Sequence, residues 1–324
     1  MILHVLSAAD VARALPMAEA IAEMRSAFTA LSRGEVDLPL RTHIKLSDPR
    51  AMTLTMPCVV RRPELIGTKL LTILPPRAVT DSSIHGVVVM FDSATGAPWG
   101  VVEGNSLTAI RTGAVSGLAT DLLARTDASV LAIIGSGTQA RTQLEAMCVV
   151  RPIEQIRVFS RTRGHAQAFA NEMSARIEIP ISVAATPVEA VRGAHIICTA
   201  TPTQTPVVSA DVVDPAVHIN AVGSFTPEMQ EIAPALVTAS IVCVDSREAA
   251  LKEAGELIAA VNDLQMDPDT WIELGALVTG QANDVPKNQP TLFKSVGLAV
   301  QDLFAASRAL TNASRDGSGQ QIPF

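Results

Sequence analysis

A glycine-rich turn is the part of this sequence whose residue types and spacing most directly suggest chemistry. It consists of Gly135, Ser136, Gly137, Thr138, Gln139 and Ala140. In the pattern G-x-G-x-x-A, the first glycine makes a tight turn, the second admits a pyrophosphate close to the backbone, and the alanine lets the helix pack on the strand. The turn lies between an apolar run at 130–134 and a helical pattern that extends toward Val150. We therefore expect a dinucleotide at this helix N-terminus, the alternative being a glycine turn that binds no nucleotide.

The end of the next strand indicates which nucleotide would bind. NAD enzymes usually place an Asp or Glu there, about 20 residues past the glycines, to bind the ribose hydroxyls. Here the apolar run 156–159 is followed by Ser160, Arg161, Thr162 and Arg163, without an acid. Because a guanidinium forms bidentate bonds with phosphate, Ser160, Arg161 and Thr162 favour NADP(H) over NAD(H). The alternative is a solvated basic turn.

Three basic residues stand in apolar surroundings. Arg41, Lys69 and Arg111 lie in stretches that contain few other charges. Since a buried charge is costly without a partner, these cations predict an anion nearby. The alternative is three independent surface side chains whose stems cover apolar residues.

The pattern of apolar residues divides the chain into two parts. Up to about residue 117 it is typical of an α+β unit, with an amphipathic helix at 17–31, strands at 53–56 and 87–91, and a turn at 92–96. Arg111 is expected to open a helix that ends near Ala124. From residue 128 on, apolar strands at 130–134, 156–159, 195–198, 218–222 and 241–244 alternate with helical stretches. This alternation predicts an α/β fold with a Rossmann-type, doubly wound parallel sheet. The polar tail 314–321 is expected to be frayed.

Composition excludes several classes of protein. The chain has 324 residues, of which 48% are hydrophobic and 3% aromatic, and its 25 Lys and Arg are outnumbered by 32 Asp and Glu. These values exclude a disordered chain and disfavour a nucleic-acid-binding protein. We expect no membrane span and no signal peptide, and therefore a cytoplasmic protein with small-molecule partners. The four cysteines, in apolar runs, are interpreted as buried thiols: Cys58, Cys148, Cys198 and Cys243.

The remaining chemically capable side chains are interpreted as structural. His195 and His218 fall in predicted strands, and no histidine pair has metal-ligand spacing, so we expect no metal. Acids near glycines are interpreted as helix-surface or capping residues: Glu253, Glu256 and Glu273. Trp99 and Trp271 are interpreted as core or interface residues.

Six segments together give the chain a specific resemblance. They are Gly67 to Lys69, Gly104 to Thr112, the turn at Gly135, Asn220 to Ser224, Glu273 to Gly275, and Phe293 to Asp302. On these segments the chain resembles the ornithine cyclodeaminase and mu-crystallin family over essentially its whole length. The resemblance implies a homodimer in which 1–117 with 297–324 form a substrate-binding and dimerisation domain. Residues 118–296 would form the Rossmann-type NADP(H)-binding domain.

The resemblance also implies roles for individual residues. Arg41, Lys69 and Arg111 match positions that bind the substrate carboxylate, and Lys69 and Arg111 are the candidate catalytic residues. Ser160 to Thr162 look like the NADP-type pattern of mu-crystallin. Further candidate cofactor contacts are Thr112, Val222, Ser224 and Gly297.

Two departures from the family pattern affect the expected reaction. Cyclodeaminases carry an aspartate where this chain has Phe225, and an acid shortly before a Met-Pro pair, where this chain has Thr55. Without these carboxylates a diamino acid lacks both its base and the anchor for its distal amine, which disfavours ornithine cyclodeamination.

Family members that lack the aspartate look like ketimine reductases. We therefore expect NADPH-dependent reduction of pyrroline-2-carboxylate or piperideine-2-carboxylate to proline or pipecolate, a reaction that needs mainly a fixed carboxylate and an aligned imine. Open-chain imino acids remain possible substrates. Two other classes stay open: a cis-3-hydroxyproline dehydratase using a hydroxyl near Ser106, and a non-catalytic NADPH-binding protein of mu-crystallin type.

Overall fold

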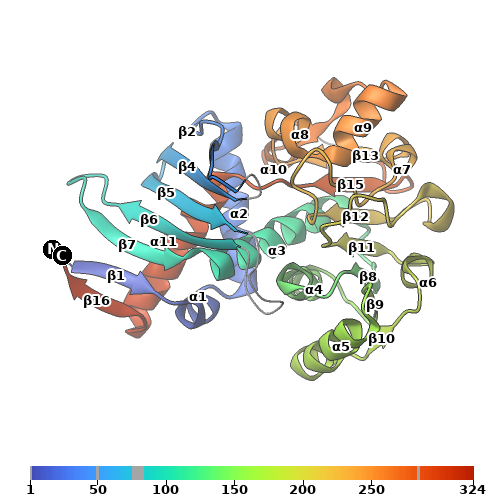
Figure 1. Ribbon diagram of the computed structural model, residues 1–324, viewed down its shortest axis with the longest axis horizontal. Coiled ribbons are helices and arrows are strands. Elements are labelled where there is room, and N and C mark those ends of the chain that lie inside the picture. Colours follow the sequence, from blue (N-terminus) through green and yellow to red (C-terminus); the bar gives the residue numbers. More distant parts are fainter. Residues whose placement is uncertain (1, 49–50, 75–83, 283–284) are drawn as a thin grey trace. The chain divides into compact units, whose positions relative to one another are not determined.

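The computed structural model describes residues 2–48, 51–74, 84–282 and 285–324 (Figure 1). The chain divides into two compact units, each described here by itself. Unit 1 contains Met1–Arg111 and Leu298–Phe324, and unit 2 contains Thr112–Gly297.

Unit 1 is built on a mixed sheet with the strand order β16-β1-β7-β6-β5-β4-β2, and β3 also pairs with β4. Only the pairing of β1 with β7 is parallel among the described strands of this sheet. The strands are β1 (Ile2–Leu6), β2 (Val36–Asp37), β3 (Thr42–Lys45), β4 (Met52–Arg61), β5 (Glu64–Ile73), β6 (Ile84–Phe91), β7 (Pro98–Glu103) and β16 (Gln320–Pro323).

Alternation along the strands gives this sheet a buried face. On β4, Leu54, Met56, Cys58 and Val60 are buried, whereas the residues between them are exposed or half-buried. Helix α11 (Ala299–Asp316) packs on β4, β5 and β6, and helices α1 (Ala8–Ala14) and α2 (Met17–Ser32) pack against α11. The predicted amphipathic helix at 17–31 is confirmed by α2.

Two sequence predictions for unit 1 are wrong. Helix α3 (Gly104–Leu123) begins seven residues before Arg111, because the Glu103 carboxylate accepts the N–H groups of Asn105 and Ser106 and so caps its first turn. The tail is not frayed: α11 runs to Asp316, and β16 pairs with β1 so that Ile322 lies opposite Leu3. The polar composition of the tail concealed an edge strand, which needs backbone partners more than apolar side chains.

Unit 2 contains an entirely parallel sheet of the order β10-β9-β8-β11-β12-β15-β13-β14. The chain runs outward from β8 to β10 and then returns to β11 on the other side of β8, which makes a topological switch between β8 and β11. The predicted Rossmann-type α/β fold is confirmed. The strands are β8 (Val130–Ile134), β9 (Gln155–Phe159), β10 (Ile181–Val183), β11 (Ile196–Thr199), β12 (His218–Ala221), β13 (Ile241–Val244), β14 (Ile272–Glu273) and β15 (Thr291–Lys294).

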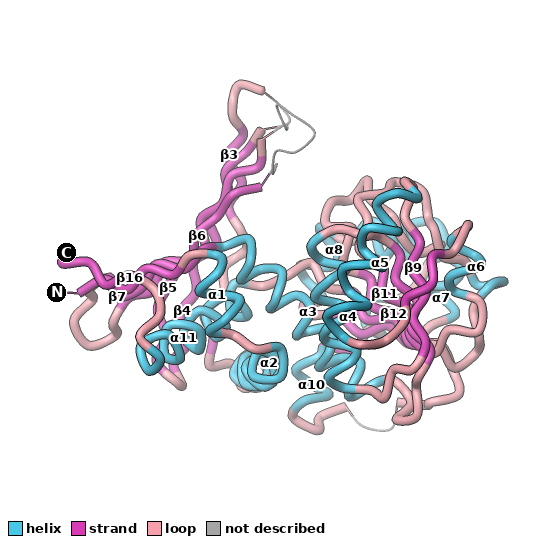
Figure 2. The backbone as a smooth tube through the Cα atoms, turned by 90° about the horizontal axis from the view of Figure 1, so that it is seen from below, coloured by secondary structure: helices cyan, strands magenta, loops and turns pink. Residues whose placement is uncertain are grey.

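Helices lie on both sides of this sheet (Figure 2). They are α4 (Thr138–Val150), α5 (Arg163–Ile177), α6 (Pro187–Val191), α7 (Pro234–Ala239), α8 (Arg247–Glu253), α9 (Gly255–Leu264) and α10 (Leu274–Val278), with short 3-10 helices at Ala210–Val212 and Pro268–Thr270. Within the ranges that the structure describes, no helix is long and apolar enough to cross a membrane.

Three of the four cysteines are buried as expected. Cys58, Cys198 and Cys243 are buried free thiols, but Cys148 is half-buried because it lies on the outer side of α4. Burial raises the pKa of the Cys148 thiol to about 11. Trp271 is in the core.

Candidate functional site

The structure brings two of the three predicted basic residues together around one acid. Lys69 on β5 and Arg111 on α3 are only 3% and 5% exposed. Lys69 Nζ lies 3.2 Å, and Arg111 Nε 3.1 Å, from the same oxygen, Oδ1 of the fully buried Asp302 on α11. Lys69 Nζ also donates to Thr108 Oγ1 at 2.6 Å, and Arg111 Nη1 donates to Gln301 Oε1 at 2.7 Å.

Burial and the three charges set the protonation of this cluster. Burial lowers the pKa of Lys69 to about 8, against the opposing effect of the Asp302 charge, and the Arg111 charge lowers it further. Burial tends to raise the pKa of Asp302, but the charges of Arg111 and Lys69 outweigh it and leave that pKa below its usual value. Asp302 is therefore ionised near neutral pH, whereas Lys69 can gain or lose a proton there.

Arg41, the third predicted basic residue, lies close enough to the cluster for its charge to act on Lys69. It is half-buried between β2 and β3, and its charge contributes to the lowered pKa values of Lys69 and His43. The ion-paired cluster that the structure describes thus contains two buried cations, Lys69 and Arg111, and one buried carboxylate, Asp302. The positive charge is in excess.

Sequence reasoning assigned no role to Asp302, Gln301 or Thr108. Both Gln301 and Asp302 are fully buried near the start of α11, among apolar neighbours such as Val300 and Leu303. Two adjacent polar residues inside an apolar run are the signal that could have revealed them, since buried polar groups require partners. Within the described structure, Asp302 Oδ2 and Gln301 Nε2 have no hydrogen-bond partner.

The side chains next to Lys69 on its face of the sheet are apolar. Lys69 pairs across the strands with Met56 and Val88, both buried. Leu54, two residues before Met56, points to the same face, whereas Thr55 points to the opposite one. Neither position supplies a carboxylate beside Lys69.

The glycine-rich turn connects β8 to α4 in unit 2 as predicted. Gly135 has φ +119°, in a region that side chains rarely adopt, and a Cβ there would lie 2.5 Å from the Ala200 carbonyl oxygen. By contrast, a Cβ on Gly137 would meet nothing within 4 Å, and Gly137 is the N-cap residue of α4. Ala140 is fully buried. The turn therefore leaves open space at the start of a helix of 13 residues.

The groups around the turn fit a dinucleotide. Arg141 Nη1 donates to the carbonyl oxygens of Ser136 and Gly137 at 2.8 and 3.1 Å, and its guanidinium pairs with Glu172. With these carbonyls occupied, the N–H groups of the first turn of α4 are the polar groups that an anion can use. Gln139 Oε1 is a buried acceptor that has no hydrogen-bond partner in the described structure.

The turn after β9 presents the predicted basic segment. Ser160 is half-buried, with Ser136 Oγ donating to its hydroxyl at 3.0 Å, and Arg161 and Thr162 are exposed before α5 begins at Arg163. This arrangement places hydroxyls and a guanidinium beside the glycine-rich turn.

The other candidate cofactor residues are largely buried. Thr112, on α3, has a carbonyl that accepts from Gln143 Nε2 at 3.2 Å, and Val222 follows β12. Gly297 has φ +83°, and its N–H donates to Asp245 Oδ2 at 2.7 Å. Ser224 is fully buried, and its hydroxyl donates to both carboxylate oxygens of Glu256 at 2.8 Å. The surface or capping interpretation of Glu256 is therefore wrong, because α9 turns this side chain inward to a polar cluster.

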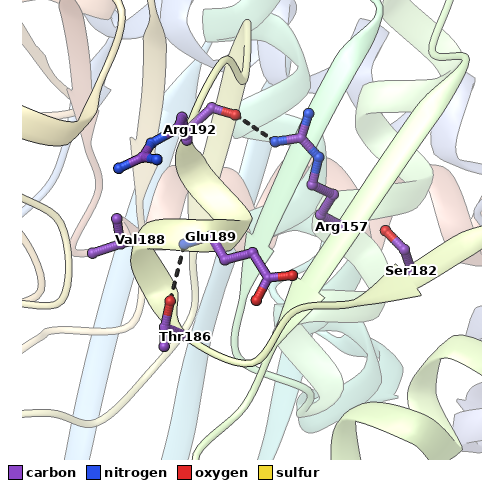
Figure 3. A pocket seen from close by; sticks show the side chains of 6 residues that line it. All are labelled: Arg157, Ser182, Thr186, Val188, Glu189 and Arg192. Carbon is purple, nitrogen blue, oxygen red and sulfur yellow. Dashed lines mark hydrogen bonds between the residues drawn. The ribbon is translucent and has the colours of Figure 1, made fainter.

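Other polar features of unit 2 do not join these sites. His218 Nδ1 lies 2.8 Å from Thr291 Oγ1, and burial lowers the pKa of His218 to about 3, so this ring stays neutral. In the described part of the chain, no group of three or more His, Cys, Asp or Glu side chains could hold a metal ion. A cavity of about 510 Å³ is lined by residues that are not among the candidates (Figure 3): Arg157, Ser182, Thr186, Val188, Glu189 and Arg192.

Comparisons with known proteins identify the family. The model of the ornithine cyclodeaminase/mu-crystallin family matches residues 3–317. The chain belongs to this family. It is 39% identical over 324 residues to a Delta(1)-pyrroline-2-carboxylate reductase of Bacillus cereus, covering 99% of each chain. It is 35% identical over 274 residues to the ketimine reductase mu-crystallin of mouse, covering 84% of each.

A solved structure within the family has the same fold. The Delta(1)-pyrroline-2-carboxylate reductase of Thermococcus litoralis, in complex with NADH and L-proline, superimposes with a TM-score of 0.94 at 35% identity. The match covers 99% of this chain and 100% of that one.

Alanine substitution should lower the free energy of unfolding much more at Gly135 than at Gly137. Gly135→Ala is expected to lower the free energy of unfolding by about 2 kcal/mol or more, because the side chain must adopt a disfavoured φ and meets Ala200. Gly137→Ala meets open space and loses only the N-cap preference for glycine over alanine, so it should cost no more than about 1 kcal/mol. Denaturant unfolding of both variants measures this difference, and equal stabilities would contradict the geometry described for the turn.

Proposed function

We propose that this family member is an NAD(P)H-dependent oxidoreductase that reduces the C=N bond of cyclic ketimine carboxylates. Its substrates would be pyrroline-2-carboxylate and piperideine-2-carboxylate, and its products proline and pipecolate. The observation that carries the proposal is the excess positive charge around Asp302. The reductases of Bacillus cereus and Thermococcus litoralis support the same reaction.

The charge of the cluster selects an anionic substrate. Two buried cations that share one carboxylate oxygen are not neutralised by it, and a buried uncompensated charge is unfavourable. A substrate carboxylate would supply the missing negative charge. Arg111 and Lys69 would bind it directly, and Arg41 would add a third positive charge.

The side chains beside Lys69 favour a cyclic imino acid over a diamino acid as the substrate. Met56 and Val88 offer methyl and methylene surface, which suits the carbons of a five- or six-membered ring. A distal ammonium would find no carboxylate at Leu54 or Thr55. Phe225, 38% exposed, stands where a cyclodeaminase has its aspartate, so the chain lacks that base.

The residues of unit 2 would hold the nicotinamide nucleotide. Gly135, Gly137 and the start of α4 would bind the pyrophosphate. The bound nicotinamide would supply the hydride for reduction of the C=N bond. The protein binds the carboxylate, orients C2 of the substrate and excludes water. Lys69, with a pKa of about 8, can provide a proton near neutral pH.

The nucleotide preference is also part of the proposal. Ser160, Arg161 and Thr162 supply hydroxyls and a guanidinium for a 2′-phosphate, and the turn contains no acid to bind ribose hydroxyls. We infer that NADPH is preferred over NADH, although the Thermococcus litoralis relative was solved with NADH.

A second copy of the chain is the proposed partner of unit 1. The sheet face opposite Lys69 carries a row of apolar side chains that are exposed or half-buried: Val59, Ile66, Leu70, Val87, Val89 and Val101. Such a contiguous apolar face marks an interaction surface. A homodimer would cover it.

The proposed reaction is tested by nucleotide oxidation with both cyclic imines. Wild-type protein should oxidise NADPH with pyrroline-2-carboxylate or piperideine-2-carboxylate. Arg111→Ala should lower kcat/KM by about a hundredfold or more, since it removes a charged partner of the substrate carboxylate and leaves Asp302 paired with Lys69 alone. The Kd for NADPH should stay unchanged, because the residues proposed to bind the nucleotide lie in unit 2. Arg125→Ala, which breaks an exposed pair with Asp127, is the control and should be neutral. Turnover of cis-3-hydroxyproline without added nucleotide would instead indicate the dehydratase.

The pH dependence of kcat/KM should report the protonation of Lys69. The protonated lysine binds the carboxylate, so kcat/KM should be high below its pKa of about 8 and fall as the pH rises through that value. Asp302→Asn removes the charge that raises this pKa, so the fall should begin at least about one pH unit lower. Ionisation of the substrate itself affects the wild type and Asp302→Asn equally, so it does not alter the difference between their pH profiles. Asp316→Asn, on the exposed end of the same helix, should leave the profile unchanged, and an identical profile for Asp302→Asn would contradict the assigned role.

Arg161 should control the choice between nucleotides. Arg161→Ala is expected to lower the ratio of kcat/KM for NADPH to that for NADH by about tenfold or more, because charged hydrogen bonds to the phosphate are lost. Arg176→Ala removes an arginine near the C-terminal end of α5, the helix that begins two residues after Arg161, where it pairs with Glu145 at 2.6 Å, and should leave the ratio unchanged. A wild-type preference for NADH would overturn the NADP(H) assignment.

The proposed dimer predicts a mass in solution of twice 34.0 kDa. Val89→Glu, in the apolar face, should shift the mass measured by light scattering toward that of one chain, since a charge in a covered apolar surface is unfavourable. Val149→Glu, at an exposed position of α4, is the matched control and should remain dimeric. A wild-type protein with the mass of a single chain would exclude the dimer.

A further inference from the structure

A buried lysine lies in unit 2, outside the site described above. Lys294 is the last residue of β15 and is fully buried. Its Nζ lies 3.1 Å from Glu256 Oε1, also fully buried, and donates to the Ser224 carbonyl oxygen at 2.6 Å. Nζ also donates to Ser224 Oγ, which in turn donates to Glu256. The ion pair therefore holds both the backbone and the side chain of Ser224.

A second buried carboxylate, Glu231, holds the same loop from another direction. Its Oε1 accepts from the N–H and the hydroxyl of Thr201 at 2.7 and 2.8 Å. Its Oε2 accepts from the N–H groups of Gly223 and Ser224 at 2.7 and 3.3 Å. Burial raises the pKa of Glu231 and the Lys294 charge opposes that effect, but these donors supply the hydrogen bonds that an ionised carboxylate requires.

These residues join the ends of three neighbouring strands. Thr201 follows β11, Gly223 and Ser224 follow β12, and Lys294 ends β15, and these three strands are adjacent and parallel. The loops also touch directly, because a Cβ on Gly223 would lie 2.1 Å from the Thr201 nitrogen. The loop after β11 in turn abuts the glycine-rich turn, since Ala200 leaves no room for a Cβ on Gly135.

The position of the cluster indicates what it serves. In doubly wound sheets a dinucleotide extends from the glycine turn across the carboxyl ends of the strands. The loops after β11 and β12 lie along this edge, on the side of the switch away from β9 and its basic turn. They are therefore the loops that would meet the nicotinamide half rather than the adenosine half.

The energetics of the buried Lys294–Glu256 pair indicate a role other than stabilising the fold. Two buried ions lose their hydration, and replacing such a pair with apolar residues of similar size is often neutral or stabilising. A hydrogen-bonded buried pair does, however, restrict the backbone to which it is bound. The pair in unit 2 restricts Ser224, while Glu231 ties Ser224 to Thr201.

We propose that Lys294, Glu256 and Glu231 are positioning residues that fix the loops after β11 and β12 for the nicotinamide half of the bound nucleotide. This inference rests on the proposed nucleotide binding and extends it to side chains that do not touch the nucleotide. Ser224 then acts through its backbone, because its hydroxyl is occupied within the protein.

The test separates the two halves of the nucleotide. Lys294→Met with Glu256→Leu removes both ions of the pair, while Glu231 keeps its hydrogen bonds from Thr201, Gly223 and Ser224. Titration calorimetry then measures the Kd of the whole nucleotide and of its adenosine fragment: NADPH and 2′,5′-ADP, or NADH and ADP if the wild type binds NADH more tightly. The double variant should bind the whole nucleotide about tenfold or more weakly and the fragment as tightly as the wild type does.

Two further variants keep this test decisive. Ser224→Ala removes only the hydroxyl that links Lys294 to Glu256. It should weaken binding of the whole nucleotide by a smaller factor and leave fragment binding unchanged. It replaces the double variant in the test if that variant does not fold. Lys252→Met with Glu248→Leu removes an exposed Lys–Glu pair of unit 2 and should change neither Kd. If the affinities for the whole nucleotide and for the fragment fell equally, the role would be merely structural and the inference would be overturned. Unchanged affinity for both would also overturn it. A wild-type protein that binds no nicotinamide nucleotide would overturn the proposed function instead.

Discussion

One carboxylate shared by two cations is the interaction on which the proposed function of unit 1 depends. Asp302 Oδ1 lies within 3.2 Å of both Lys69 Nζ and Arg111 Nε, in surroundings from which water is nearly excluded. Without this carboxylate, neither cation would be held at so low an exposure, because an unpaired buried charge is strongly unfavourable. With it, the described cluster keeps one positive charge in excess while Lys69 is protonated. Helix α11 therefore does more than cover the sheet, since it carries the carboxylate that holds both cations of the proposed anion-binding site.

Unit 2 uses buried carboxylates in a different way. Glu231 and Asp245 accept backbone N–H groups from segments that follow β12 and β15, and Glu256 holds Ser224 through its hydroxyl. Each carboxylate restrains a loop at the carboxyl edge of the parallel sheet, the edge where nucleotides bind in such folds. Specific geometry at this edge is thus fixed by buried polar contacts, while the apolar strands beneath supply the stability.

Sequence reasoning found what local patterns encode and missed what distant contacts create. The glycine-rich turn, the strands that flank it and helix α2 were predictable because turn chemistry and periodicity are local. Lys69 and Arg111 stood out because a charge within an apolar stretch is unusual. Their partner Asp302 is 233 residues from Lys69, and a single sequence does not reveal such pairing. Glu256 was misjudged for the same reason, since only the tertiary fold brings Lys294 to it.

The most direct test of this account is proton uptake on ligand binding. Pyrrole-2-carboxylate, a ring carboxylate with no group that titrates near pH 9, would be titrated into the protein with saturating NADP⁺, in two buffers of different ionisation enthalpy. At pH 9 Lys69, with a pKa of about 8, is mostly neutral, and a bound carboxylate should raise that pKa. The account predicts uptake of roughly half to one proton per chain, absent in Lys69→Met. Binding without proton uptake, or no binding, would contradict it.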